Sequence, residues 1–244
     1  MKKLSAIIIG LSCLSCLAGC TDIGLKDDGS RAFVSKATVI GDGENGYYCY
    51  SDVLPAIACS DAFAGIERGY FTFTYTESDW TTAPDGKMYI AHVHAYPIDV
   101  YDIIHPLSAA EAEKGQFIDK ERCTVPERLT VDHAANGYVD LSSQFSTFNQ
   151  ESGAYSHGDV RIVYDPAQQE PDTLRLQLYY IPSLPDGWTK TSSDYRTVSC
   201  DLSSLASLCQ WNDSLTLVVD DGDQKKHCRR MSKKNFLKPR IETE

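Results

Sequence analysis

Apolar and polar residues alternate along most of the chain after its first thirty residues. In residues 69–78, GYFTFTYTES, the aromatic residues Phe71, Phe73 and Tyr75 alternate with hydroxyl-bearing residues. A period of two places one set on each face of an extended strand, so this run predicts a β-strand with one aromatic face. Similar strand patterns occupy residues 32–40, 47–52, 87–98, 127–133, 136–145, 159–166, 172–182, 195–205 and 213–222.

The connections between these runs favour an all-β fold in two domains. Asn136-Gly137 and Asp221-Gly222 are tight-turn dipeptides, and no long amphipathic helix separates one strand from the next. This spacing indicates antiparallel sheets, most simply a sandwich. Residues 99–115 break the pattern, with apolar residues at helical spacing interrupted by Pro106, and predict a short helix or a connection. We therefore predict one domain over residues 32–110 and a second over residues 111–244.

The N-terminus has the pattern of an export signal. Two lysines precede a short apolar run, which ends in Leu17, Ala18, Gly19 and Cys20. This arrangement is typical of a bacterial lipoprotein signal, which predicts that peptidase recognises residues 17–19 and that Cys20 becomes the lipidated first residue. Residues 1–19 would then be a signal peptide, and the polar residues 20–31 a tether. The alternative is an ordinary signal or an uncleaved anchor with an incidental cysteine.

The net charge argues against nucleic acid as a partner. The chain carries 34 acidic and 23 basic side chains, for a net charge of −11. The basic residues are concentrated near the end, in KKHCRRMSKK at 225–234. This segment could contact an anion such as a lipid head-group phosphate, or it could be a solvated tail that pairs with the protein's own acids.

Six cysteines follow Cys20, and an exported chain allows them to form disulfides. The candidate pairs are Cys49 with Cys59, which lie close in sequence across a predicted turn, and Cys200 with Cys209, which have similar spacing. The alternative is that several of the six are buried thiols that act as small hydrophobic residues.

No pattern of catalytic or metal-binding residues stands out. His92 and His94 would share a strand face, as two metal ligands must, but a site would need a third ligand from a distant segment, such as His105, His133, His157 or an acid. The favoured interpretation is two polar residues on the outward face of a strand. The acid pairs Asp99 with Asp102 and Asp220 with Asp221 could supply an acid and a base for chemistry on a glycan. Asp221, however, lies in a predicted turn, where its side chain has a conformational role. Motifs for a serine nucleophile or a phosphate-binding loop do not occur. The sequence therefore predicts no catalytic residues, no metal and no cofactor.

The order of short motifs resembles that of the NigD-like lipoproteins of Bacteroides-type bacteria. The resemblance implies an N-terminal OB-like barrel and a C-terminal β-sandwich, and it supplies no catalytic residues; the family name reflects an association with bacteriocin production. The matching pieces are the motif ending at Cys20, KATV at 36–39, GYY at 46–48, RGYFTFTY at 68–75, MYIAHVHAYPIDVYDII at 88–104, GYVDL at 137–141, LRLQLYY at 174–180 and DLSSL at 201–205.

Together these features lead us to expect a non-enzymatic lipoprotein of the cell envelope. Lipidated Cys20 would hold it on the outer membrane, because Thr21 rather than Asp follows the cysteine, on the periplasmic or the cell-surface face. Its partner would be a protein or a glycan, and the aromatic residues would serve as core or as a stacking surface. The alternatives are a bacteriocin-immunity-like protein and a glycan-processing enzyme.

Overall fold

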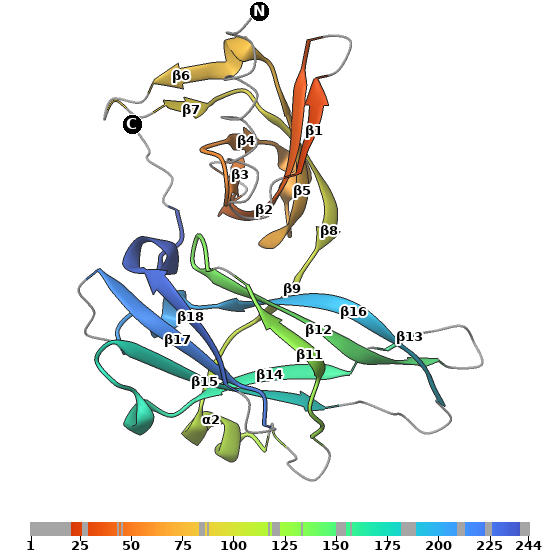
Figure 1. Cartoon of the computed structure of the whole chain (residues 1–244), viewed down its shortest axis with the longest axis vertical. Helices are drawn as coiled ribbons and strands as arrows, with labels where there is room; N and C mark the ends of the chain where they lie inside the picture. The colour runs from red at the N-terminus through yellow and green to blue at the C-terminus, as the bar shows by residue number, and fades with distance from the viewer. Residues whose placement is uncertain are drawn as a thin grey trace, which may run out of the picture. The chain divides into compact units, whose positions relative to one another are not determined.

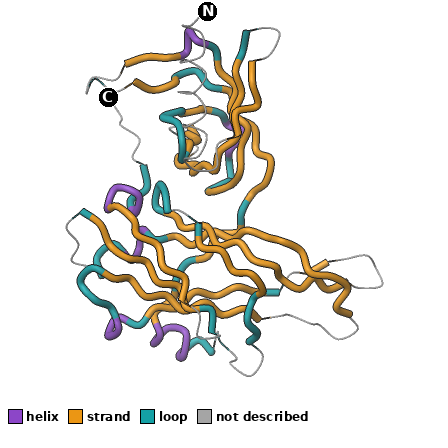
Figure 2. The backbone as a smooth tube through the Cα atoms, in the orientation of Figure 1, coloured by secondary structure: helices purple, strands orange, loops and turns teal. Residues whose placement is uncertain are grey.

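The structure is a computed structural model in which strands dominate, as Figures 1 and 2 show. The residues that it describes are 21–25, 29–42, 44, 46–82, 86, 88–116, 118, 123–132, 134–149, 155–156, 158–181, 189–208, 213–222 and 226–239. Within these ranges no helix is long and apolar enough to cross a membrane. The predicted all-β class is confirmed.

The chain forms two compact units, each with its own hydrophobic core. The first contains the described residues up to Tyr101, and the second runs from Asp102 to Lys238. Residues 102–110, which the sequence analysis placed in the first domain, belong to the second unit. They do so because two short strands in this segment pair with strands of the second unit.

The first unit is built on one sheet in which every pairing is antiparallel. The order across this sheet is β4-β3-β2-β5-β8, and β1 lies beside β2. Its strands are β1 (Thr21–Leu25), β2 (Arg31–Asp42), β3 (Gly46–Ser51), β4 (Ile57–Cys59), β5 (Arg68–Tyr75) and β8 (His94–Val100). A hairpin of β6 (Trp80–Thr82) and β7 (Met88–Ile90) and the short helices η2 (Asp61–Phe63) and η3 (Glu77–Asp79) complete the unit.

The structure differs from the predicted tether at strand β1. Residues 21–25, expected to be an unstructured part of the segment 20–31, pair with the first part of β2. Strands β1 and β3 pair with the same edge of β2. Because β3 occupies only the later part of this long edge, β1 can pair with the first part. Main-chain pairing requires no apolar periodicity, and the sequence pattern therefore gave no sign of this strand.

The sheet of the first unit is open, whereas the resemblance implied an OB-like barrel. Strands β4 and β8, at its two ends, contact each other, but no hydrogen-bonded ladder joins them in the described part of the chain. Strand β4 has only three residues, and β8 carries Pro97, which has no N–H to donate. A register shift in β8 between Pro97 and Asp99 further interrupts its pairing.

The aromatic face predicted for residues 69–78 forms the core of the first unit. Phe71 and Phe73 are fully buried, whereas Tyr70 and Thr72 on the opposite face are half-buried. Phe73 stacks on Phe33 of β2 with ring centroids 4.9 Å apart. Each buried phenylalanine contributes about 1.5–3 kcal/mol through the apolar area that it removes from water. Phe71 and Phe73 therefore belong to the core and not to an exposed stacking surface.

The second unit is a sandwich of two sheets. Their orders are β11-β12-β16-β9, with β13 beside β12, and β10-β14-β15-β17-β18. The strands are β9 (Asp102–Ile104), β10 (Leu107–Ser108), β11 (Glu127–Val131), β12 (Tyr138–Asn149), β13 (Tyr155–Ser156), β14 (Asp159–Tyr164), β15 (Thr173–Ile181), β16 (Thr189–Asp201), β17 (Ser214–Asp220) and β18 (Lys226–Ser232). The helices are α2 (Ala109–Lys114), η4 (Pro166–Gln168), η5 (Ser203–Leu205) and η6 (Lys233–Phe236).

Pairing in this sandwich is mixed, whereas the sequence suggested purely antiparallel sheets. The pairs β10–β14, β15–β17 and β9–β16 are parallel. Parallel neighbours need a connection that crosses over, usually a helix. Here β16, which lies in the opposite sheet, provides the crossover between β15 and β17. The sandwich can therefore contain parallel strands without the long helices whose absence suggested antiparallel pairing.

Candidate functional site

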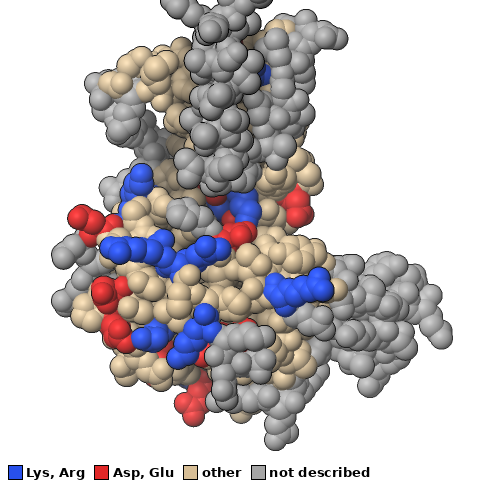
Figure 3. All heavy atoms as spheres, in the orientation of Figure 1, with Lys and Arg blue, Asp and Glu red and all other residues tan. Residues whose placement is uncertain are grey.

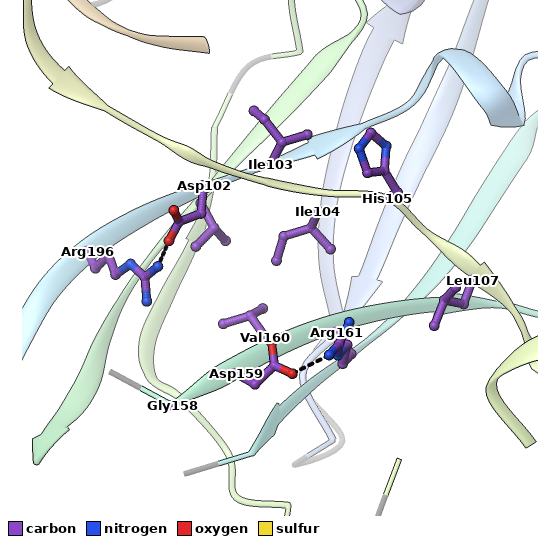
Figure 4. Close-up of a pocket in the computed structure, with 11 residues that line it drawn as sticks. Asp102, Ile103, Ile104, His105, Leu107, Gly158, Asp159, Val160, Arg161 and Arg196 are labelled. Atoms are coloured by element: carbon purple, nitrogen blue, oxygen red, sulfur yellow. Dashed lines mark ion pairs between the residues drawn. The ribbon is translucent and has the colours of Figure 1, made fainter. Parts of the chain in front are cut away.

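A pocket of about 440 Å³ opens at one edge of the sandwich in the second unit. We call it the edge pocket. It lies where the chain passes from one sheet to the other: β9 pairs with β16, and β10 then pairs with β14. Pro106 stands between the two strands and cannot donate to either ladder, which suits it to the crossing. The lining residues are Asp102, Ile103, Ile104, His105, Leu107, Gly158, Asp159, Val160, Arg161, Arg196 and Val198 (Figure 4).

Two ion pairs border the edge pocket, as the dashed lines of Figure 4 show. Asp102 on β9 binds the guanidinium of Arg196 on the neighbouring strand β16. Asp159 binds Arg161 two residues further along β14, with Nη2 and Oδ2 2.5 Å apart. Residues two apart on a strand share a face, so this second pair is a direct product of the sequence Asp-Val-Arg. The carboxylates of Asp102 and Asp159 are thus each paired with a guanidinium.

Aliphatic side chains separate these ion pairs. Ile104 extends from β9 and Val160 from β14 into the space between the two strands (Figure 4). Val160 and Val198 are buried, whereas His105 at the crossing is exposed. The pocket therefore combines an apolar floor with charged groups, as ligand sites commonly do.

Close to His105, Asp201 is held in place by hydrogen bonds. Its carboxylate accepts hydrogen bonds from the backbone N–H and the hydroxyl of Ser203 at 2.9 and 2.6 Å, and it lies 2.9 Å from the Lys238 ammonium. Burial alone would raise the pKa of Asp201, but these hydrogen bonds outweigh it and lower the pKa below the usual value. His105 Nδ1 is 3.7 Å from the same carboxylate.

The predicted lipidation motif, Leu17, Ala18, Gly19 and Cys20, lies outside the described residues, and so does Cys209. Of the candidate disulfides, Cys49 and Cys59 are both free thiols in the structure. Their strands do pair, but Cys49 stands opposite Ala58 and Cys59 opposite Tyr48. Adjacent positions point to opposite faces of the sheet, so Cys49 is buried and Cys59 is exposed. Cys200 is likewise a buried free thiol.

In the structure the two histidines are exposed, and Asp220 and Asp221 make local contacts. His92 precedes β8 with a φ of 53°, and both His92 and His94 are exposed. Asp220 accepts the Gly222 N–H at 2.9 Å, and Asp221 lies 3.2 Å from His227. No group of three potential metal ligands occurs within the described ranges.

The basic segment near the C-terminus forms β18 and η6, and blue side chains gather over this region in Figure 3. Its cations make local contacts: the Arg229 Nε–H donates to the Val131 carbonyl at 2.7 Å, and the Arg230 guanidinium to the Ser214 hydroxyl. Lys238 pairs with Asp201 at 2.9 Å. Lys238 lies beyond the segment 225–234, so this ion pair does not decide between the two interpretations of that segment.

Sequence reasoning missed the edge pocket. It considered Asp102 together with Asp99, whereas in the structure Asp102 forms an ion pair with Arg196. It did not select Asp159, Arg161 or Arg196. The available signal was two charges at alternate positions of β14, Asp159 and Arg161, yet a solvated strand face gives the same pattern. The role of Asp102 and Arg196 depends on the pairing of β9 with β16, which joins segments almost a hundred residues apart and leaves no local trace.

Solved structures resemble this chain, whereas neither a protein-family model nor a curated protein sequence matches it. A putative lipoprotein from Bacteroides fragilis NCTC 9343 is 8% identical with a TM-score of 0.50, over 82% of this chain and 97% of that one. A protein of unknown function, DUF1344, from Bacteroides vulgatus ATCC 8482 is 12% identical with a TM-score of 0.40, over 82% and 90%. An uncharacterized protein from Parabacteroides merdae ATCC 43184 is 9% identical with a TM-score of 0.42, over 81% and 95%.

These similarities concern the fold. The likeness to the Bacteroides fragilis protein shows that the all-β arrangement is shared with a protein of Bacteroides-type bacteria. The name NigD-like stays a prediction from the sequence.

Proposed function

We propose that this protein is a lipid-anchored, non-enzymatic binding protein of the bacterial cell envelope, which holds a protein or glycan partner in the edge pocket. The observation that carries the proposal is the pocket itself: about 440 Å³, with an apolar floor between two Asp–Arg ion pairs. Such a lining offers fixed charges and hydrogen-bond donors together with apolar area, which is the chemistry of recognition.

The pairing of the carboxylates with arginines supports binding over catalysis. A pair of acids that hydrolyses a glycan needs one carboxyl group that can give up a proton. Asp102 and Asp159 are each held in an ion pair with an arginine of the pocket rather than facing one another across it as an acid and a base. We accordingly place the protein among binding proteins and not among glycan-processing enzymes.

Attachment to the outer membrane is the second part of the proposal. It rests on Leu17 to Cys20 and on Thr21 after the cysteine, and the Bacteroides fragilis neighbour, a putative lipoprotein by name, agrees with it. A partner on the periplasmic or the cell-surface face would then meet a pocket that is confined to the envelope.

The binding claim is tested by chemical crosslinking in native envelopes, followed by affinity capture of the full chain and mass spectrometry. We expect the wild-type protein to capture a partner that the double variant Arg161→Ala with Arg196→Ala no longer captures. Arg230→Ala is the matched control, because Arg230 is an exposed arginine outside the pocket. Equal capture by the wild type and the double variant would refute the edge pocket as the site.

A further inference from the structure

The sheet β10-β14-β15-β17-β18 of the second unit contains another hollow on its outer face, of about 340 Å³. We call it the outer-face groove. It shares no lining residue with the edge pocket. Its floor comes from β14, β15, β17 and β18, and its wall includes the segment around η4.

A row of four side chains crosses the floor of this groove. Val163 stands opposite Gln177, Gln177 opposite Asp220, and Asp220 opposite Lys226. All four residues line the groove. Because neighbouring strands lie about 4.8 Å apart, the row extends over roughly 14 Å, which is enough for a short chain of sugar rings.

Hydrogen bonds hold the amides of the groove in place. Gln177 Nε2 donates to the Asp220 carbonyl at 3.2 Å, and Gln168 Nε2 donates to Asp165 Oδ2 at 3.0 Å. Gln169 bridges the backbone of Arg175, accepting from its N–H at 2.8 Å and donating to its carbonyl at 3.1 Å. Among the described residues, the Gln177 and Gln168 side-chain carbonyls have no hydrogen-bond donor. Two oriented acceptors are thus left for a ligand.

Tyr179 supplies an aromatic surface beside the row. It lines the groove next to Gln177 on the same face of β15 and is half-buried. Burial first, and then the nearby Cys123 and Asp220, raise the pKa of the phenol, so the hydroxyl keeps its proton at neutral pH. A flat ring with a hydroxyl donor suits stacking on the C–H face of a sugar.

The charges of the groove balance. Asp165 and Asp220 are matched by Arg175 and Lys226, although the chain as a whole has a net charge of −11. A charged ligand would therefore gain little from this groove, whereas a neutral ligand rich in hydroxyls can use donors and acceptors alike. The groove also lies over β15 and β17, whose two edges are both occupied by strands. An extended peptide could not add to them as a further strand.

We propose that the outer-face groove binds a segment of a neutral oligosaccharide, with Tyr179 stacking on a ring and Gln177, Gln168 and Asp220 holding its hydroxyls. This inference rests on the proposed function in naming a glycan as a partner, but it places that glycan at a site of its own. The anchor and the edge pocket are not needed for it.

Isothermal titration calorimetry of the full chain in detergent tests this proposal with five probes: cellohexaose, xylohexaose, mannohexaose, maltohexaose and chitohexaose. We expect at least one to bind, and Tyr179→Ala and Gln177→Ala each to raise its Kd about tenfold or more. Thr216→Ala is the matched control on the same sheet face outside the groove, and it should leave the Kd within about twofold.

Two results would overturn the inference. One is the absence of binding by all five probes at millimolar concentration. The other is binding that survives both groove substitutions. If binding is instead lost in Arg196→Ala, the glycan occupies the edge pocket, and the groove assignment fails while the proposed function stands.

Discussion

Arg68 is among the bulkiest fully buried side chains in the described part of the chain, and it is charged. Its guanidinium binds both carboxylate oxygens of Asp52, at 2.7 and 2.5 Å, and donates to the Thr38 hydroxyl at 2.9 Å. A buried charge is tolerated only when it is paired and hydrogen-bonded in this way. At the scale of single residues, this pair ties the segment after β3 to strands β2 and β5.

Removing one member of the pair should destabilise the first unit strongly. Arg68→Met leaves the Asp52 carboxylate without its partner, and we expect a loss of about 3–5 kcal/mol in the free energy of unfolding. The double variant Arg68→Met with Asp52→Leu removes both charges and should recover most of that loss. Urea unfolding followed by circular dichroism measures both, and a double variant no more stable than Arg68→Met would contradict the account.

The cysteines give a second prediction at this scale. Burial, followed by the Asp52 carboxylate, raises the pKa of Cys49, and Arg68 only partly offsets this; burial and then Asp201 raise the pKa of Cys200. We expect iodoacetamide to alkylate the exposed Cys59 and Cys228 in the native protein and to spare Cys49 and Cys200, as peptide mass spectrometry would show. The same assay in urea is the control. A Cys49–Cys59 disulfide in protein purified without reductant would contradict the structure.

At the scale of elements, the turn before β12 has the conformation that its sequence predicts. Asn136 and Gly137 have φ values of 51° and 89°, and Ala135 and Tyr138 exchange backbone hydrogen bonds at 3.0 Å across them. A two-residue turn with positive φ at both positions is the one that Asn-Gly favours. Gly137 also lies against the chain at Lys238, where an added Cβ would be 3.0 Å from the backbone nitrogen.

Gly137→Ala should therefore destabilise the second unit by about 2 kcal/mol or more, because left-handed strain and the Lys238 contact add together. Gly65→Ala is the matched control: Gly65 has a φ of 77°, and an added Cβ meets nothing within 4 Å. We expect that control to cost only the left-handed strain, about 1 kcal/mol in unfolding free energy. Thermal unfolding of both variants gives the comparison, and equal losses would show that the Lys238 contact contributes nothing.

Strands with one buried face were predictable from sequence, and strands held only by distant pairing were not. In β15, Leu174, Leu176 and Leu178 are buried at every second position, as their alternation predicts. Ile103, Ile104 and Leu107 have helical spacing, yet they lie in β9 and β10, and the helix α2 begins at Ala109. A short apolar run fits either period, and here pairing with β16 and β14 decided the outcome.

At the scale of the whole molecule, sequence and structure contribute different parts of the functional argument. The structure supplies the edge pocket, whose charged residues come from β9, β14 and β16 and could not be assembled from local pattern. The sequence predicts the anchor, because the signals for export and lipidation are read from the chain before it folds. The proposal of an envelope-bound binding protein needs both, and the predicted anchor would determine where a partner should be sought.

The most direct measurement of the central claim is metabolic labelling of cells with an alkyne analogue of palmitate, followed by membrane fractionation. We predict that wild type and Cys16→Ser are labelled and sediment with the outer membrane, since Cys16 has no aliphatic residue three positions before it. Cys20→Ser should lose the label and leave the outer membrane. A Cys20→Ser protein that remains labelled and membrane-bound, or a wild type without label, would contradict the account.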